Sequence, residues 1–318
     1  MNAIGGYLCL ELRRGEHFHR NALHLNTARN AFEYVLRVRK YKKVYIPYYT
    51  CDVMLQPLKL LRVCYKFYRI NENLEPIDLP FLNNDEAFVY TNYFGLKQRC
   101  VERLATHYGK QLIVDNAQAF YAEPLEGIDT FYSARKFFGV PDGAYLYTDG
   151  NLDIEFDIDN SSERCIHLLK RIDQGAEAAY EDFKTNEAVL DNQPIHRMSM
   201  LTESLMASID YETIRKLRVD NFKILDAALC GLNQLHLSLD EKSVPMVYPY
   251  LTNNPLTKKR LIESHIFVAT YWRNVLKWCK KGEWEHSIAR DACFLPIDQR
   301  YGNDDMMNVI RIIKSFKI

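Results

Sequence analysis

The first half of this chain alternates strand-like with helix-like segments, and this alternation constrains the fold more than any other feature. Apolar residues at helical spacing predict a helix over residues 28–38, and further helices are predicted over 51–61 and 101–108. Runs of β-branched and aromatic residues predict strands over 43–47, 63–70, 87–90, 111–115, 130–133 and 144–148. Such alternation is typical of an α/β fold, in which helices cover both faces of a mostly parallel sheet.

The second half has a different pattern. Longer polar helices are predicted over residues 161–184, 198–209 and 211–229. Short strands are predicted over 244–251, 267–270 and 293–297, and a last helix ends at Lys314. We therefore predict two domains, a large α/β domain over residues 1–205 and a smaller α+β C-terminal domain over 206–318.

Composition excludes several classes of function. The chain has 41 basic and 41 acidic residues, so no net charge attracts nucleic acid or an anionic membrane. No apolar stretch approaches the length of a membrane span. The eight cysteines include no CxxC pair and the nine histidines no HExxH motif, so the sequence indicates reduced thiols in a cytoplasmic protein and no metal site.

Three residues stand where strands end or helices begin, which is where open α/β sheets bind ligands. Asp115 closes the strand over residues 111–115, Thr27 precedes the first helix, and Lys136 follows the strand over 130–133. Taken singly, each has a common structural explanation. An aspartate or threonine there often caps a helix, and a lysine is often solvated surface.

The order and spacing of these residues are more specific. Residues 114–119 read Val-Asp-Asn-Ala-Gln-Ala, residues 133–136 read Ser-Ala-Arg-Lys, and Gly139, Pro141, Asp142 and Gly143 follow. This series resembles the core of the DegT/DnrJ/EryC1/StrS sugar aminotransferases, a family of fold-type-I enzymes dependent on pyridoxal 5'-phosphate. Similar segments occur at residues 25–28, 46–50, 92–95 and 294–301.

The resemblance implies a role for each residue around the cofactor ring. Lys136 would form a Schiff base with the cofactor aldehyde and move protons, which requires a lysine amine that is neutral. Asp115 would pair with the protonated pyridine nitrogen and so maintain the ring as an electron sink. Gln118 would lie near the phenolic oxygen of the ring.

The resemblance also implies a phosphate site. Thr27 and the backbone amide of Ala28 would bind the cofactor phosphate at the start of the first helix, where N–H groups and the helix dipole favour an anion. Ser133 is expected to bind the same phosphate. Arg29 could add positive charge there, although a structural role explains it equally well.

The chain departs from the family pattern at several positions. Asn26 replaces the usual glycine of the phosphate turn, and Ala144 stands where a second glycine usually follows Gly143. Cys51 falls where many members place an aromatic ring over the pyridine, and we expect Tyr49 to stack there instead. The chain is also shorter than most relatives, so the loops that shape the sugar site are expected to be trimmed.

The resemblance implies an aminotransferase that moves an amino group from an amino acid, glutamate being the expected donor, to a keto-sugar, expected to be nucleotide-linked. Such sugars enter surface polysaccharides or secondary metabolites. Family members work as homodimers, so a homodimer is expected here.

Two alternatives remain open, and a third is weak. The same cofactor could run a dehydration or elimination, although relatives specialised for sugar dehydration replace the lysine with histidine and this chain has Lys136. A degenerate relative could act as a non-catalytic binding or regulatory subunit. A dinucleotide-dependent sugar enzyme is disfavoured because no GxGxxG follows an early strand.

Overall fold

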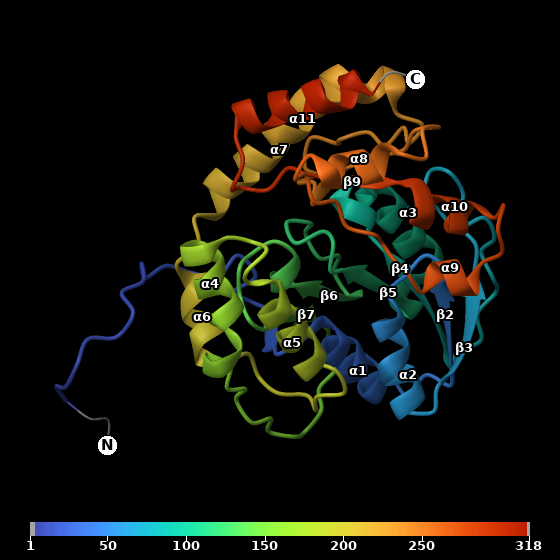
Figure 1. Ribbon diagram of the computed structural model, residues 1–318. Helices are drawn as coiled ribbons and strands as arrows, with labels where there is room; N and C mark the ends of the chain where they lie inside the picture. Colours follow the sequence, from blue (N-terminus) through green and yellow to red (C-terminus); the bar gives the residue numbers. More distant parts are fainter. Residues whose placement is uncertain (1–3, 317–318) are drawn as a thin grey trace.

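The computed structural model describes residues 4–316 and contains a mixed seven-stranded sheet in the first half of the chain (Figure 1). The strand order is β1-β7-β6-β5-β4-β2-β3. Strands β2 to β6 pair parallel to their neighbours, whereas β7 is antiparallel to both β6 and β1. The strands are β1 Leu23–Leu25, β2 Lys43–Pro47, β3 Cys64–Tyr68, β4 Glu86–Thr91, β5 Leu112–Asn116, β6 Asp129–Ser133 and β7 Ala144–Tyr147. The expected α/β class with a mostly parallel sheet is confirmed.

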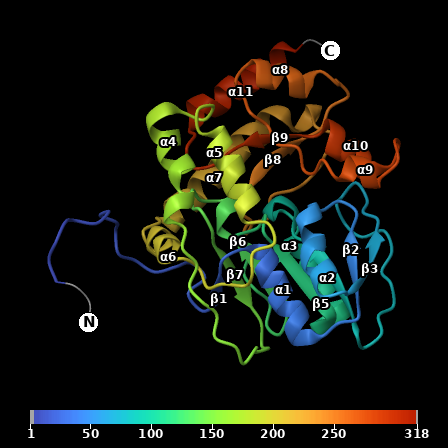
Figure 2. The same cartoon turned by 60° about the horizontal axis from the view of Figure 1, so that its bottom comes forward.

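Helices cover both faces of this sheet because successive strand residues point to opposite sides. On β4, Ala87 and Val89 pack in a core with α1 (Ala28–Arg39) and α2 (Leu55–Leu60). Phe88 and Tyr90 pack on the other side, in a core that includes α3 (Gln98–Tyr108). Figure 2 shows α1 and α2 on one side of the sheet.

The prediction of one long helix over residues 161–184 is wrong in one respect. The segment forms two helices, α4 (Ile166–Gln174) and α5 (Tyr180–Val189), that are separated at Gly175. Gly175 has φ +88°, which ends the helix, since glycine adopts this conformation without a Cβ penalty. The next two helices, α6 (Met200–Ala207) and α7 (Tyr211–Leu229), lie where they were predicted.

The C-terminal part of the chain packs around a two-stranded antiparallel sheet of β8 (Val247–Tyr250) and β9 (Cys293–Pro296). The strand predicted over 267–270 is reduced to one bridge, between Ala269 and Phe294. In Figure 1, α7 and the last helix lie side by side. The remaining helices are α8 Thr257–Glu263, α9 Val275–Trp278, α10 Trp284–Asp291 and α11 Asn303–Ser315.

Short 3-10 turns connect several of these elements. They are η1 Asp52–Met54, η2 Tyr93–Gly95, η3 Gly109–Gln111, η4 Ala134–Lys136, η5 Ser162–Arg164 and η6 Cys230–Leu232. The turn η4 carries Lys136 and directly follows β6, so the end of this strand fixes the backbone position of Lys136. None of the helices in residues 4–316 is both long and apolar enough to cross a membrane.

Candidate active site

Several of the predicted site residues lie at the carboxyl edge of the sheet. Asp115 lies near the end of β5, and Ser133 ends the neighbouring strand β6. Backbone hydrogen bonds join the loops that follow, since the Ala134 amide donates to the Gly143 carbonyl at 3.0 Å and the Gly143 amide donates to the Asn26 carbonyl at 2.6 Å. The lysine turn, the glycine turn and the turn before α1 therefore form one continuous backbone unit.

Asp115 is a buried carboxyl group with neutral hydrogen-bond donors. The amide of Ala117 donates to its Oδ1 at 2.8 Å, and the hydroxyl of Thr91 donates to its Oδ2 at 3.3 Å. Burial raises the pKa of Asp115 to about 6, against the opposing effects of the two hydrogen bonds and the charge of Lys136. Within residues 4–316 no cation lies at ion-pair distance, so this carboxyl could accept a buried cationic ligand.

Lys136 is an exposed residue whose amine interacts with charged neighbours. Loss of hydration and the neighbouring guanidinium groups of Arg135 and Arg29 lower the pKa of Lys136, whereas Cys51 and Asp115 oppose this effect. A lysine with a lowered pKa has a larger neutral fraction, which is the nucleophilic form.

Two guanidinium groups lie beside this lysine, and each pairs with a carboxylate, Arg29 with Asp191 and Arg135 with Glu187. Arg29 in the first turn of α1 and Arg135 repel each other, and burial with this repulsion lowers the pKa of Arg135 to about 10. Arg29 also donates to Gln56 and to the Leu190 carbonyl, each at 3.1 Å, which orients its guanidinium group. The N–H groups and the dipole of a helix N-terminus favour an anion such as a phosphate, and Arg29 lies in the first turn of α1.

The turn before α1 holds two of the predicted phosphate ligands. The Thr27 hydroxyl caps α1, accepting from the Asn30 amide at 3.2 Å, and the amides of the first helical turn, including that of Ala28, have no acceptor within the helix. Asn26 has no positive φ, so its turn does not require the glycine of the family pattern. Its side-chain Nδ2 atom instead donates to the Pro194 carbonyl at 3.0 Å.

Gln118 and Ser133 leave polar groups available near the lysine. The Oε1 atom of Gln118 accepts from the Phe94 amide at 3.2 Å, while its Nε2 atom is buried with no partner among the described residues. Ser133 is buried, and its hydroxyl does not cap the turn η4. Both groups could therefore bind a ligand at this edge of the sheet.

Tyr49 has no free ring face on which a cofactor ring could stack. Its ring is fully buried and contacts Tyr93 and Trp272, at centroid distances of 5.6 and 5.0 Å. Two other residues near Lys136 were not predicted to act there. Cys51 interacts with the charge of Lys136, and the Tyr271 ring centroid lies 5.9 Å from Lys136 Nζ. No motif in the sequence marks Tyr271.

Gly143 and Ala144 explain another departure from the family pattern. Gly143 has φ +115°, and a Cβ atom there would lie 3.0 Å from a methyl group of Thr202 and 3.2 Å from the Cβ of Ala134. Ala144 begins β7 and pairs with Leu25 and Ser133 as an ordinary strand residue. One glycine is thus sufficient for this turn.

Two other features lie apart from the strand ends. A cavity of about 1080 Å³ lies between α8 and α10, and none of the predicted site residues lines it. His17, His24 and Glu203 place possible ligand atoms within 4.8 Å of one another, a group that sequence spacing could not reveal. The two imidazole rings stack at 4.7 Å with an interplanar angle of 17°, and both contact the Glu203 carboxylate.

The sheet order, the crossing loops and the C-terminal α+β part define the fold-type-I architecture of pyridoxal phosphate transferases. No family model matches the sequence, and no curated protein matches it. Solved structures do match. The sugar aminotransferase CalS13 from Micromonospora echinospora superimposes with a TM-score of 0.65 at 14% identity, covering 94% of this chain and 88% of CalS13.

Two further structures agree with this match. A DegT DnrJ EryC1 StrS aminotransferase from Brucella abortus has a TM-score of 0.61 at 14% identity, covering 93% of this chain and 85% of its own. DesI, solved in the presence of its TDP-sugar product, has a TM-score of 0.63 at 12% identity, covering 92% of this chain and 80% of its own. The chain therefore has the fold of the family that its motifs resemble.

Proposed function

We propose that this protein is a pyridoxal phosphate-dependent aminotransferase that transfers an amino group from an amino acid, with glutamate as the donor, to a nucleotide-linked keto-sugar. One observation carries the proposal. Asp115 lies near the end of β5 and Lys136 follows the adjacent strand β6, and the charge of each acts on the other. A buried carboxyl without a cation therefore lies near an amine of lowered pKa, which suits a ligand with a basic ring nitrogen and an aldehyde.

The described residues fit the cofactor on independent grounds. Asp115 has no ion-pair partner among the described residues, and Gln118 has an unpartnered amide nitrogen. We assign the phosphate to Thr27, the Ala28 amide and Ser133. Tyr49 keeps its predicted place beside the ring only if its side chain rotates out of the core.

Bound pyridoxal phosphate would withdraw electrons from the carbon that carries the transferred amine. Asp115 would hold the ring nitrogen in its protonated form, because its buried carboxylate gains a cationic partner. Lys136 Nζ would hold the aldehyde and then move a proton, since its lowered pKa brings it closer to neutral pH. Gln118 Nε2 would donate a hydrogen bond to the phenolic oxygen.

We further propose a cytoplasmic homodimer that acts in polysaccharide biosynthesis, with a large domain over residues 1–205 and a small domain over 206–318. All eight cysteines are free, which agrees with a reducing compartment. Two proteins with this fold support a sugar substrate, since CalS13 is a sugar aminotransferase and DesI was solved in the presence of its TDP-sugar product.

The visible spectrum of the purified protein with added pyridoxal phosphate tests the proposal. We expect an absorption band from the lysine-bound cofactor that borohydride bleaches and that Lys136→Ala abolishes. Incubation with glutamate should then convert this band to that of the aminated cofactor. A wild-type protein without any such band would support a non-catalytic binding subunit instead. A band that glutamate and other amino acids leave unchanged would indicate another reaction type.

A further inference from the structure

The peptide that follows Lys136 is held by two side chains from distant parts of the chain. Arg218 on α7 donates from Nη2 to the Phe137 carbonyl at 3.1 Å. Gln299, beyond β9, donates from Nε2 to the same carbonyl at 2.8 Å. Residues of the C-terminal part of the chain therefore occupy both lone pairs of the Phe137 carbonyl, one residue after Lys136.

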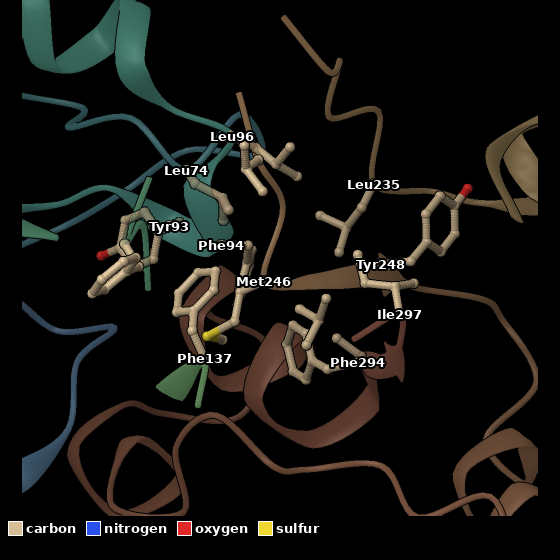
Figure 3. Close-up of a cluster of buried hydrophobic side chains, with 14 of the residues drawn as sticks. Leu74, Tyr93, Phe94, Leu96, Phe137, Leu235, Met246, Tyr248, Phe294 and Ile297 are labelled. Atoms are coloured by element: carbon tan, nitrogen blue, oxygen red, sulfur yellow. The ribbon is translucent and has the colours of Figure 1, made fainter. Parts of the chain in front are cut away.

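Arg218 is an unusual residue for a protein core. It is 2% exposed, and no carboxylate lies at ion-pair distance from it within residues 4–316. Its other contacts are the Met246 carbonyl, at 3.0 Å from Nη1, and the Phe137 ring, whose centroid lies 4.6 Å from the guanidinium carbon. Phe137 and Met246 belong to the same buried cluster (Figure 3).

A buried guanidinium group without a carboxylate loses much of its hydration and is compensated only in part by carbonyls and a ring. This cost lowers the pKa of Arg218 to about 10. An apolar side chain at this position would avoid the free-energy cost of burying a charge. We therefore attribute the presence of Arg218 to the carbonyl groups that its hydrogen bonds hold. They join the lysine turn to the segment before β8.

Asn221, three residues later on the same helix, strengthens this connection. Its Nδ2 atom donates to the Ile297 carbonyl at 3.2 Å and to the Tyr301 carbonyl at 2.9 Å. These contacts fix the loop that carries Gln299. One buried face of α7 thus orients both the lysine turn and the residue that helps to hold it.

We infer that Arg218 and Gln299 are positioning residues that direct the Lys136 amine toward Asp115 by fixing the Phe137 carbonyl across the two parts of the chain. This inference rests on the proposed function, in which Lys136 is the reacting amine. The contact also couples the lysine to the C-terminal part of the chain, which supplies Tyr271 beside the amine.

The test measures the amine itself and does not require the cofactor. Full-length protein without cofactor is acetylated with acetic anhydride over a pH series, and mass spectrometry follows the peptide that contains Lys136. The variants are Arg218→Met, Arg218→Lys and Gln299→Leu. Arg215→Met, on the same helix with a half-exposed side chain and only a 3.9 Å contact to Glu212, is the matched control.

We expect Arg218→Met and Gln299→Leu to raise the labelling midpoint by about one pH unit, because the released amine regains hydration and this outweighs the loss of the nearby Asp115 charge. A shift of this size slows labelling about tenfold at neutral pH. Arg218→Lys should restore part of the shift, because it retains one donor, and Arg215→Met should leave the midpoint unchanged. With pyridoxal phosphate, the first two variants should also form the lysine-bound band more slowly.

A shift in Arg218→Met alone, with Gln299→Leu unchanged, would show that only the charge of Arg218 matters and would overturn the positioning role. An unchanged midpoint in both variants would overturn it as well. If Arg218→Met does not fold, as judged by thermal unfolding, Gln299→Leu decides the question. Failure of the wild type to bind pyridoxal phosphate would refute the proposed function and leave the labelling result valid.

Discussion

The hydroxyl of Thr91 donates a 3.3 Å hydrogen bond to Oδ2 of Asp115 across adjacent parallel strands. With the Ala117 amide, it provides a neutral environment in which burial dominates and raises the pKa of Asp115 to about 6. An acid with a pKa above its unfolded value destabilises the fold once it ionises. Asp115 is therefore a residue retained at a cost in stability, as expected at a functional site.

Asp115→Asn should stabilise the cofactor-free protein near pH 8 by about 1–3 kcal/mol, because the folded state no longer buries an ionised carboxylate. The gain should shrink as the pH falls from about 6 to about 4, where the folded wild type keeps its proton and only the unfolded state ionises. Urea unfolding over this pH range measures it. Equal stabilities at every pH would contradict the assignment of a raised pKa.

Thr27→Val should lower stability by about 0.5–2 kcal/mol, because the first turn of α1 loses its cap. It should also weaken pyridoxal phosphate binding, since the hydroxyl is a proposed phosphate ligand. Thr27→Ser retains the oxygen and is the matched control for both effects. Urea unfolding and a cofactor titration measure them, and unchanged affinity in Thr27→Val would remove Thr27 from the phosphate site.

Gly143→Ala should destabilise the protein by about 1–3 kcal/mol, because φ +115° strains an alanine and the new methyl group meets Thr202 and Ala134. Gly282→Ala is the control, since Gly282 has φ +94° with no atom within 4 Å of its Cβ position. Thermal unfolding should show the larger loss at Gly143. Equal losses would mean that backbone strain alone acts at both positions.

Arg39→Met should destabilise the protein by about 3–5 kcal/mol, because it leaves the buried carboxylate of Asp129 without its cation. Arg39 donates two hydrogen bonds of 2.7 Å to this carboxylate, which is fully buried at the start of β6. The double variant Arg39→Met/Asp129→Leu should recover part of the loss, since no unpaired charge then remains. Chemical denaturation of both variants tests this, and a double variant no more stable than Arg39→Met would refute the explanation.

Local sequence was sufficient for the elements whose pattern is repeated along the chain. The apolar run from Leu112 to Val114 predicts the buried strand β5, and the acid that follows this run marks the edge of the sheet. The helix α7 has the bounds that its spacing predicted. The order of Asp115, Ser133 and Lys136 likewise indicated the fold, which the solved structures confirm.

Other features depend on contacts that leave no pattern in the sequence. Strand β1 has only three residues, too few for a visible period, and it forms because β7 offers it an antiparallel partner. The break at Gly175 needed a backbone angle that the helical pattern on both sides concealed.

Residue identity and spacing along the chain thus determined six of the seven strands of the sheet, most of the helices and the candidate lysine and aspartate, because each depends on neighbouring residues. Only the tertiary structure placed Arg218 and Gln299 on the Phe137 carbonyl, from 81 and 162 residues away. Every residue has a backbone carbonyl, so a side chain that binds one shows no complementary partner in the sequence, and only the folded chain can reveal the contact.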